Sequence, residues 1–268
     1  MTPTSTRAVA YSYLGLIAIF VYLPVAVLVL FSLQDGRLPV PPFNGPSFKW
    51  YSAIFADARL MAALRTSIIV AVLSSAMAVF IGFLAAFGSA RFTMNLSKTQ
   101  RALITAPLSV SYLIIGMGLL ILFNWLGVPK SLLAVGIGHV VINMPLCFAI
   151  IYSQFGDHQA NIERAARDLG APEWKVLTLV TAPMMVPALF ASFFLSMTFS
   201  WDEFVIAFLL TRFDVTLPVE IWNLLRSGLN PKTNAIGSVV FLVSIVVVLG
   251  MELSVLRHRL VAPKGQTS

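Results

Sequence analysis

The chain has few charged residues and almost no cysteine. Charged side chains make up 11% of its 268 residues, whereas a soluble domain carries about 25%. This shortage excludes an ordinary soluble globular domain. The single cysteine, Cys147, has no partner for an intrachain disulfide, and one thiol cannot supply the several thiolates of a structural zinc site.

Signatures of catalysis are missing as well. The sequence contains no Gly-x-x-x-x-Gly-Lys-Ser/Thr loop for nucleotide phosphates, no serine in a nucleophile elbow and no His-Glu metal pair. We therefore expect no catalytic residue, no metal and no cofactor in this chain. The net charge of +7 would suit nucleic acid in a soluble protein, but no Lys/Arg cluster is interleaved with stacking aromatic residues, so no nucleic acid is expected.

Hydrophobic residues, by contrast, are abundant and fall in long runs. They make up 58% of the sequence, and the mean hydropathy is +0.88. A bilayer core requires about 20 consecutive apolar residues in a helix. Runs of that length predict an all-α integral membrane protein with one transmembrane domain over 1–268. Its six helices are expected at 12–33, 64–90, 102–125, 131–153, 184–210 and 235–256.

The distribution of lysine and arginine indicates the orientation only weakly. With both termini in the cytoplasm, ten of these residues lie inside and eight outside, which together are the 18 of the chain. Arg91, Lys98 and Arg101 then mark a cytoplasmic link, and the proline-bearing segment 34–63 becomes an external loop. The expected location is a membrane that the chain crosses several times, with membrane lipid around the helices.

A polar stretch at 162–183 separates the fourth and fifth spans. Gly170 followed by Pro172 indicates the end of one helix and the start of another. On the first helix, Ala165, Ala166 and Leu169 share a face by their spacing. Two short helices that meet at a sharp turn can dock in a groove of another protein. The alternative, on spacing alone, is an ordinary polar loop between two spans.

The same stretch resembles the EAA loop of ABC importer permeases. The pattern of that loop is Glu-Ala-Ala, three residues, Gly, nine residues, Ile, one residue and Leu-Pro. The residues at matching places are Ala165, Ala166, Gly170, Val180 and Pro183. Arg164 stands where the family has its glutamate, with Glu163 one residue early, and Ala182 replaces the leucine.

The resemblance implies a type I ABC importer permease-like bundle in which the loop at about 154–183 is a cytoplasmic coupling helix. In that family this helix lies in a cleft of a separate ATPase and transmits its closure to the spans. If Arg164 faces the ATPase, the partner should carry an acidic or neutral contact there. The residues expected to couple to the ATPase are Glu163, Arg164, Ala165, Ala166, Asp168 and Gly170.

The implied partners follow from the same family. They are a second permease subunit, two cytoplasmic ATPase subunits that bind ATP and Mg, and an extracytoplasmic substrate-binding protein, assembled at a bacterial inner membrane. Four further segments resemble the polyamine branch of these permeases, which transports putrescine and spermidine: 183–189, 196–204, 217–222 and 230–235. Other small solutes use the same scaffold. A secondary transporter, which commonly has inverted repeats, and an intramembrane enzyme are the rival classes.

Two carboxylates lie inside the fifth span. Asp202 and Glu203 follow Trp201 in an otherwise apolar run, where an unpaired charge costs about 2.5 kcal/mol or more. Adjacent helix residues point about 100° apart, so one carboxylate can face a pathway while the other caps a backbone group or pairs with an arginine such as Arg212. One hypothesis is that Asp202 or Glu203, with the Trp201 ring, helps to pass a cationic substrate. The alternative is a structural ion pair.

His139 and Asn143 form another polar feature of the spans. They lie four residues apart beside Pro145 and share a face of the fourth span. A polar catalytic cluster is one interpretation, and hydrogen bonds between helices are the one we expect.

Overall fold

A computed structural model describes residues 3–92, 97–228 and 230–261 of the chain. Within these residues the regular structure is helical apart from one isolated β-bridge, between Gln34 and Pro46, which confirms the predicted all-α class. The α-helices are α1 (Pro3–Ser32), α2 (Lys49–Phe55), α3 (Ala58–Arg91), α4 (Ser97–Thr105), α5 (Tyr112–Trp125), α6 (Leu132–Tyr152), α7 (Asp157–Asp168), α8 (Glu173–Lys175), α9 (Ala182–Asp202), α10 (Val205–Leu210), α11 (Leu217–Ser227) and α12 (Pro231–Val261). A 3₁₀ turn covers Ala106–Ser109, and a π-helical segment covers Val176–Thr181.

Membrane spans are recognisable among these helices by length and composition. Five helical stretches are long and apolar enough to cross a membrane, namely Val9–Ser32, Ala58–Arg91, Leu132–Tyr152, Glu173–Asp202 and Pro231–Gly250. The bent pair Lys98–Ser109 and Tyr112–Trp125 makes a sixth if it is counted as one span. The six predicted apolar runs therefore match the helical segments, whereas the two chain ends that we expect in the cytoplasm lie outside the described residues.

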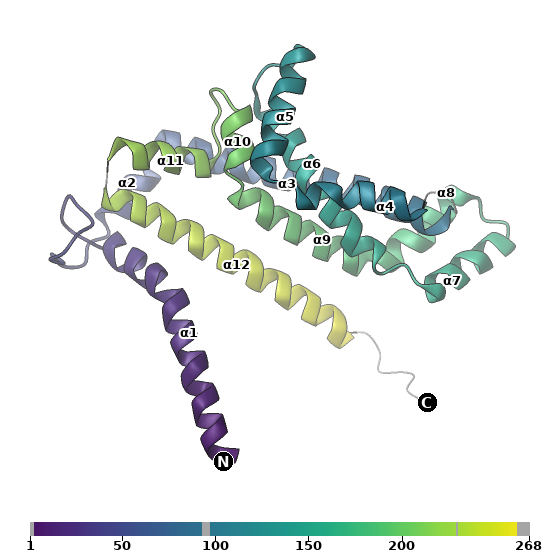
Figure 1. Cartoon of the computed structure of the whole chain (residues 1–268), viewed down its shortest axis with the longest axis horizontal. Coiled ribbons are helices and arrows are strands. Elements are labelled where there is room, and N and C mark those ends of the chain that lie inside the picture. The colour runs from purple at the N-terminus through teal and green to yellow at the C-terminus, as the bar shows by residue number, and fades with distance from the viewer. Residues whose placement is uncertain (1–2, 93–96, 229, 262–268) are drawn as a thin grey trace. The chain divides into compact units, whose positions relative to one another are not determined.

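The third predicted span is not one straight helix, which corrects the prediction for 102–125. α4 ends at Thr105, the 3₁₀ turn follows, and α5 begins at Tyr112 after a bend of 102°. Pro107 lacks a backbone N–H donor, and Val110 is extended with ψ of 137°. Figure 1 shows α5 turned away from α4 at this point. Average hydropathy reports the apolar content of a run and contains no information about such a local break.

The fifth predicted span, 184–210, is also interrupted. α9 ends at Asp202, Glu203 is extended with ψ of 116°, and α10 begins at Val205. The Glu203 carboxylate accepts hydrogen bonds from backbone N–H groups of the new helix, at Ile206 and Ala207. Capping of this kind favours a fresh helix start over continuation of α9.

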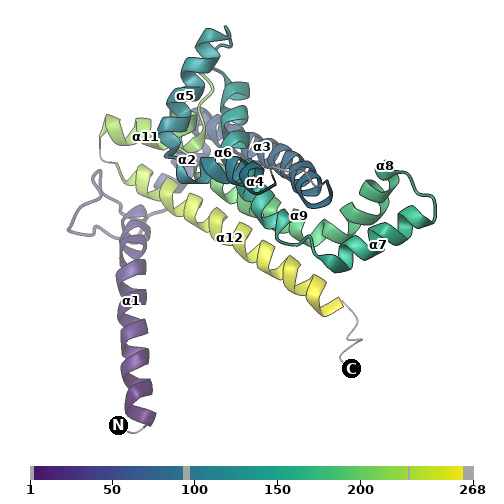
Figure 2. The same cartoon turned by 45° about the vertical axis from the view of Figure 1, so that its right-hand side comes forward.

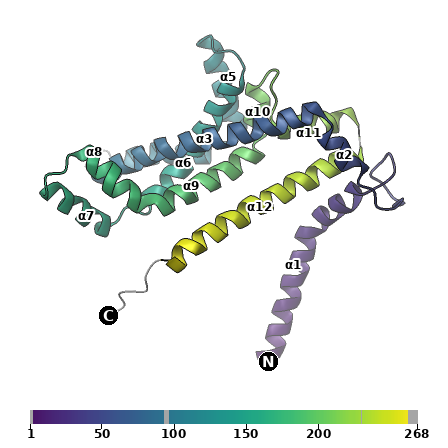
Figure 3. The ribbon, with the colours of Figure 1, turned by 180° about the vertical axis from the view of Figure 1, so that it is seen from behind.

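Two compact units divide the chain. The first comprises Met1–Met61 and Glu220–Ile245, and the second comprises Ala62–Val219 and the chain from Val246. In the second unit, α3, α6 and α9 run alongside one another (Figures 1 and 3). One buried cluster in this unit centres on Ile206 and Leu210 of α10, and another on Phe148 of α6 and Met185 of α9.

The first unit contains the proline-bearing loop, which folds around the side chain of Gln34. This side chain is 1% exposed; its amide nitrogen donates to the carbonyls of Val40 and Pro42, and its oxygen accepts from Asn44. The Trp50 indole donates to the Gln34 carbonyl at 2.7 Å. The loop is therefore ordered by one buried amide and an aromatic residue of α2.

Asp57 fixes the start of α3 within the same unit. Its carboxylate accepts from the backbone N–H groups of Arg59 and Leu60, and Lys232 Nζ lies 2.5 Å from its other oxygen. The hydrogen bond from Lys232 lowers the pKa of the Asp57 carboxyl below its usual value of 3.8. The stabilisation from this pair is therefore complete above that value and is lost as the pH falls through the lowered pKa.

A substitution on α6 tests the packing of α10 in the second unit. A Cβ at Gly138 would lie 2.5 Å from Cγ2 of Ile206 and 3.0 Å from Cδ1 of Leu210, whereas a Cβ at Gly136 meets nothing within 4 Å. Gly138→Ala should therefore destabilise the purified protein by about 1–3 kcal/mol through overpacking. Gly136→Ala is the matched control and should be neutral or slightly stabilising. Thermal unfolding in detergent measures both, and equal melting temperatures would contradict the packing described.

Candidate functional site

The polar stretch folds into an elbow of two short helices, as predicted. α7 begins after Gly156, whose N–H donates to the Gln159 side chain, and it ends before Gly170. Gly170 has φ of +85°, in the left-handed region that favours glycine. Pro172 then precedes α8. Figures 2 and 3 show α7 and α8 folded back towards each other at one end of the second unit.

Glu163 anchors this elbow from the inside. Its side chain is fully buried, with the Arg91 Nε atom 2.5 Å from one carboxylate oxygen. The other oxygen, Oε1, accepts from the Thr181 hydroxyl at 3.0 Å and from Arg91 Nη2 at 3.3 Å. Nη2 of Arg167, on α7 itself, lies 3.9 Å from Oε2. Arg91 is the last residue of α3 and Thr181 ends the π-helical segment before α9. One carboxylate therefore ties α7 to two long helices through charge-assisted bonds.

The other predicted coupling residues point away from this anchor. Arg164, Ala165, Asp168 and Gly170 are exposed, and Ala166 is half-buried. The elbow thus separates the two neighbours of the predicted motif, with Glu163 inside and Arg164 on the surface.

Apolar side chains stand on the exposed surface of the elbow. Leu169 is 89% exposed and Trp174 is 63% exposed. Across the turn, Arg167 Nε donates to Glu173 at 2.7 Å, and this hydrogen bond raises the pKa of Arg167 above its usual value. The pair joins α7 to the first residue of α8 across the turn.

The break between α9 and α10 forms a second polar site. Glu203 is 5% exposed, and its Oε2 atom accepts from the N–H groups of Ile206 at 2.9 Å and Ala207 at 3.2 Å. Asp202, in contrast, is exposed. The two adjacent carboxylates therefore have different environments, and the capping role that we left open for one of them falls to Glu203. Arg212 lies over the Phe213 ring, 4.9 Å from its centre.

A chain of buried polar groups leads from this break into the bundle. His139 Nε2 lies 3.5 Å from Oε2 of Glu203, and His139 Nδ1 lies 2.6 Å from the Ser200 hydroxyl. Ser200 is in turn 3.1 Å from Ser74 of α3. The helix α6 that carries His139 starts where the Ser131 side chain accepts from the N–H of Ala134. The expected interhelical hydrogen bond of His139 is confirmed.

The groups Ser200, His139 and Glu203 stand in the order of a hydrolase triad. Sequence reasoning missed this arrangement because 61 residues separate Ser200 from His139. Ser200 is only 4% exposed, however, and its hydroxyl already contacts both His139 and Ser74. A nucleophile without access to a substrate cannot start acyl transfer, so these groups hold helices together.

Trp201 and Asn143 complete the predicted polar candidates. Trp201 is 8% exposed and Asn143 is 1% exposed. Among the residues that the structure describes, neither the Trp201 indole nitrogen nor the Asn143 amide nitrogen has a hydrogen-bond partner. Trp201 therefore belongs to the interior of the second unit, and its neighbour Asp202 is the residue that reaches the surface.

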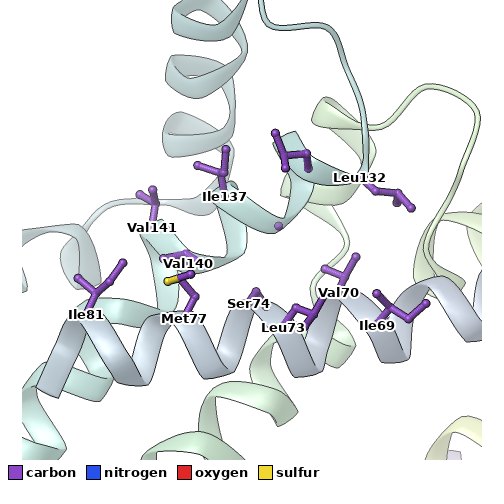
Figure 4. A pocket seen from close by; sticks show the side chains of 12 residues that line it. Ile69, Val70, Leu73, Ser74, Met77, Ile81, Leu132, Ile137, Val140 and Val141 are labelled. Carbon is purple, nitrogen blue, oxygen red and sulfur yellow. The ribbon is translucent and has the colours of Figure 1, made fainter.

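An apolar groove runs between α3 and α6 (Figure 4). It has a volume of about 540 Å³, and its walls include Leu73 and Met77 of α3 and Ile137 and Val140 of α6. Such a surface suits a lipid chain or another apolar helix. A cationic solute requires carboxylates or aromatic faces, so the groove is unsuited to one.

The apolar helices of spanning length, the polar elbow and the buried hydrogen-bonded groups are those of a multi-span membrane protein. The chain belongs to the family of binding-protein-dependent transport system inner membrane components, whose model matches residues 78–263. The predicted resemblance to ABC importer permeases is thereby confirmed. The match also sets aside a secondary transporter and an intramembrane enzyme as its class.

Curated relatives and a solved structure extend this match. The chain is 26% identical over 249 residues to the spermidine/putrescine transport system permease protein PotC of Escherichia coli K12, covering 92% of this chain and 94% of the relative. It is 32% identical over 229 residues to the putrescine transport system permease protein PotI of the same strain, covering 82% and 81%. A chain of a bacterial alginate ABC transporter, solved with a pentasaccharide-bound periplasmic protein, has the same fold, with a TM-score of 0.69, 16% identity and 92% coverage of both chains.

The Glu163 anchor can be tested with two isosteric substitutions. Glu163→Gln removes the charge that neutralises Arg91 in a buried place, and we expect it to destabilise the protein by about 1.5–3 kcal/mol. Glu173→Gln removes the same charge from the exposed pair with Arg167, where the side chain is 57% exposed, and should change stability much less. Thermal unfolding of both purified variants measures the two losses of stability. Similar losses in the two variants would show that Glu163 is not a special anchor.

Proposed function

We propose that this chain lines the translocation pathway of an ABC importer for a small cationic solute, with putrescine or spermidine as the favoured class. ATP hydrolysis on a separate ATPase subunit would drive the transport. The observation that carries the proposal is the anchored elbow, because it offers an exposed docking surface that is firmly tied to the long helices.

Coupling to an ATPase requires a surface contact and a stiff connection behind it. The exposed residues Arg164, Ala165, Asp168 and Gly170, with Ala166 at their edge, supply the contact. Glu163 supplies the connection through Arg91 and Thr181. A displacement of α7 is then passed to α3 and to the π-helical segment that leads into α9, because one buried carboxylate bonds to both.

The substrate class is supported by the names of the relatives and by one surface carboxylate. The two relatives reported above serve spermidine and putrescine transport, and both of these solutes are polyamines. Asp202 is exposed at the end of α9, where it can meet a cationic solute without an ionic partner of its own among the described residues. Glu203 acts in this proposal through the shape of the break, and Trp201 supports the backbone from the interior.

The complete importer contains other chains. We propose a second permease subunit, two cytoplasmic ATPase subunits that hold ATP and Mg, and an extracytoplasmic binding protein that delivers the solute. A periplasmic protein accompanies the alginate transporter described above. The elbow and both termini would face the cytoplasm, and the whole chain from 1 to 268 would act as one transmembrane domain. Each partner can shift the transporter between states only through different affinities for them.

Uptake in reconstituted vesicles tests the transport proposal. The chain is reconstituted in proteoliposomes with the proposed partner permease and ATPase. ATP is enclosed, the proposed binding protein is added outside, and entry of labelled spermidine and putrescine is measured. We expect ATP-dependent uptake. Asp202→Asn should reduce this uptake several-fold, because it removes the surface charge that meets the amine, while leaving assembly intact.

Two controls accompany this assay. Replacing the nucleotide-binding lysine of the ATPase should abolish uptake. Labelled alginate oligosaccharide, which lacks the positive charge, should not enter. Uptake that persists without a functional ATPase, or that excludes both polyamines, contradicts the proposal.

Docking of the elbow is tested by a charge placed on its apolar surface. Leu169→Glu puts a carboxylate at a position that is 89% exposed, so the fold should tolerate it while binding of the ATPase is lost. Phe213→Glu is the matched control, at a position that is 81% exposed in the loop after α10. Copurification of the ATPase with each variant gives the answer. Equal recovery of the ATPase with both variants would argue against the elbow as its docking surface.

A further inference from the structure

The turn between α9 and α10 lies against a residue from another helix. Oε2 of Glu203 accepts from the N–H groups of Ile206 and Ala207, and the same oxygen lies 3.5 Å from Nε2 of His139 on α6. One atom is therefore placed between the first turn of α10 and an imidazole ring. Both Glu203 and His139 are buried.

The ring of His139 is itself oriented by its second nitrogen. Nδ1 lies 2.6 Å from the Ser200 hydroxyl, and Ser200 lies 3.1 Å from Ser74. When Ser200 donates to Nδ1, Nε2 carries the ring hydrogen. Nε2 lies 3.5 Å from Oε2 of Glu203 and makes no hydrogen bond among the described residues, so its contact with the carboxylate is one of proximity. The serines of α3 and α9 thus fix which side of the imidazole faces the break.

We propose that His139 is a positioning residue of the translocation pathway: it holds Glu203 on the first turn of α10 and thereby fixes the direction of Asp202. The two carboxylates are adjacent in the chain, and Asp202 is the exposed one. A backbone rotation that releases Glu203 from α10 also turns Asp202. The inference rests on the proposed function, in which Asp202 meets a cationic solute.

Two amide substitutions test the roles of the two ring nitrogens of His139 one at a time. Asparagine places its amide near the position of Nδ1 and keeps the contact with Ser200, whereas glutamine reaches the position of Nε2 and keeps a donor towards Glu203. In the complete reconstituted importer, His139→Asn should raise the KM for spermidine or putrescine by about fivefold or more with little change in kcat. His139→Gln should keep the KM close to that of the unsubstituted importer. A merely structural role would lower kcat or the amount of assembled importer in both variants.

A second measurement reports the direction of position 202 without any substrate. The only cysteine of the sequence, Cys147, is fully buried and is first replaced by Cys147→Ser. Asp202→Cys then introduces a single reactive thiol, and the rate of its reaction with a charged methanethiosulfonate reagent is followed in the assembled importer. Adding His139→Asn should change this rate, and adding His139→Gln should leave it unchanged.

The two measurements distinguish the possible failures. Equal labelling rates in all three backgrounds, or the same KM for the asparagine and glutamine variants, overturn the positioning role of His139. An unsubstituted importer that takes up neither polyamine overturns the proposed function. In that case the labelling rates still decide whether His139 sets the direction of residue 202.

Discussion

The ion pair between Glu163 and Arg91 is the interaction on which the elbow and its place at the end of the bundle depend. A carboxylate that is fully buried must be neutralised, because removing one partner of such a pair leaves an uncompensated charge in a medium of low dielectric constant. Arg91 provides the opposite charge and donates to both carboxylate oxygens, and Thr181 adds a hydrogen bond to Oε1. The need to satisfy one carboxylate thus brings the ends of α3 and of the π-helical segment to α7.

The second buried carboxylate, that of Glu203, is hydrogen-bonded in a different way. Glu203 lies against backbone N–H groups rather than an arginine, and these groups belong to the helix that starts because the carboxylate is there. A cap of this kind stabilises negative charge at a helix start without a bulky cation. It also explains how a run that is apolar enough to span a membrane comes to contain a break at one residue.

The sequence predicted the helical class, the positions of the apolar runs and the elbow at Gly170, because hydropathy, glycine and proline act locally. It did not predict the bend after Pro107 or the break at Glu203. The outcome at both places depends on which backbone groups find partners, and average hydropathy does not contain that information. The hydrogen-bond partners of Glu163 and His139 could not be predicted from the sequence either, because Arg91 and Ser200 are distant from them in the chain. Of the roles left open for Asp202 and Glu203, the capping role of Glu203 became visible only through its burial and its hydrogen bonds to Ile206 and Ala207.

The register of the elbow follows from the same physical constraint. In the family pattern the glutamate directly precedes the two alanines, but here Glu163 stands one residue earlier and is turned about 100° around the helix from Arg164. That rotation places the carboxylate inside, next to Arg91, and leaves the cation of Arg164 on the surface beside Ala165. A partner that docks on this surface therefore meets a positive charge at the position where the family pattern has a negative one. If the elbow docks on an ATPase as proposed, we expect that subunit to carry an acidic or neutral residue opposite Arg164, because a like charge in a desolvated contact would oppose docking.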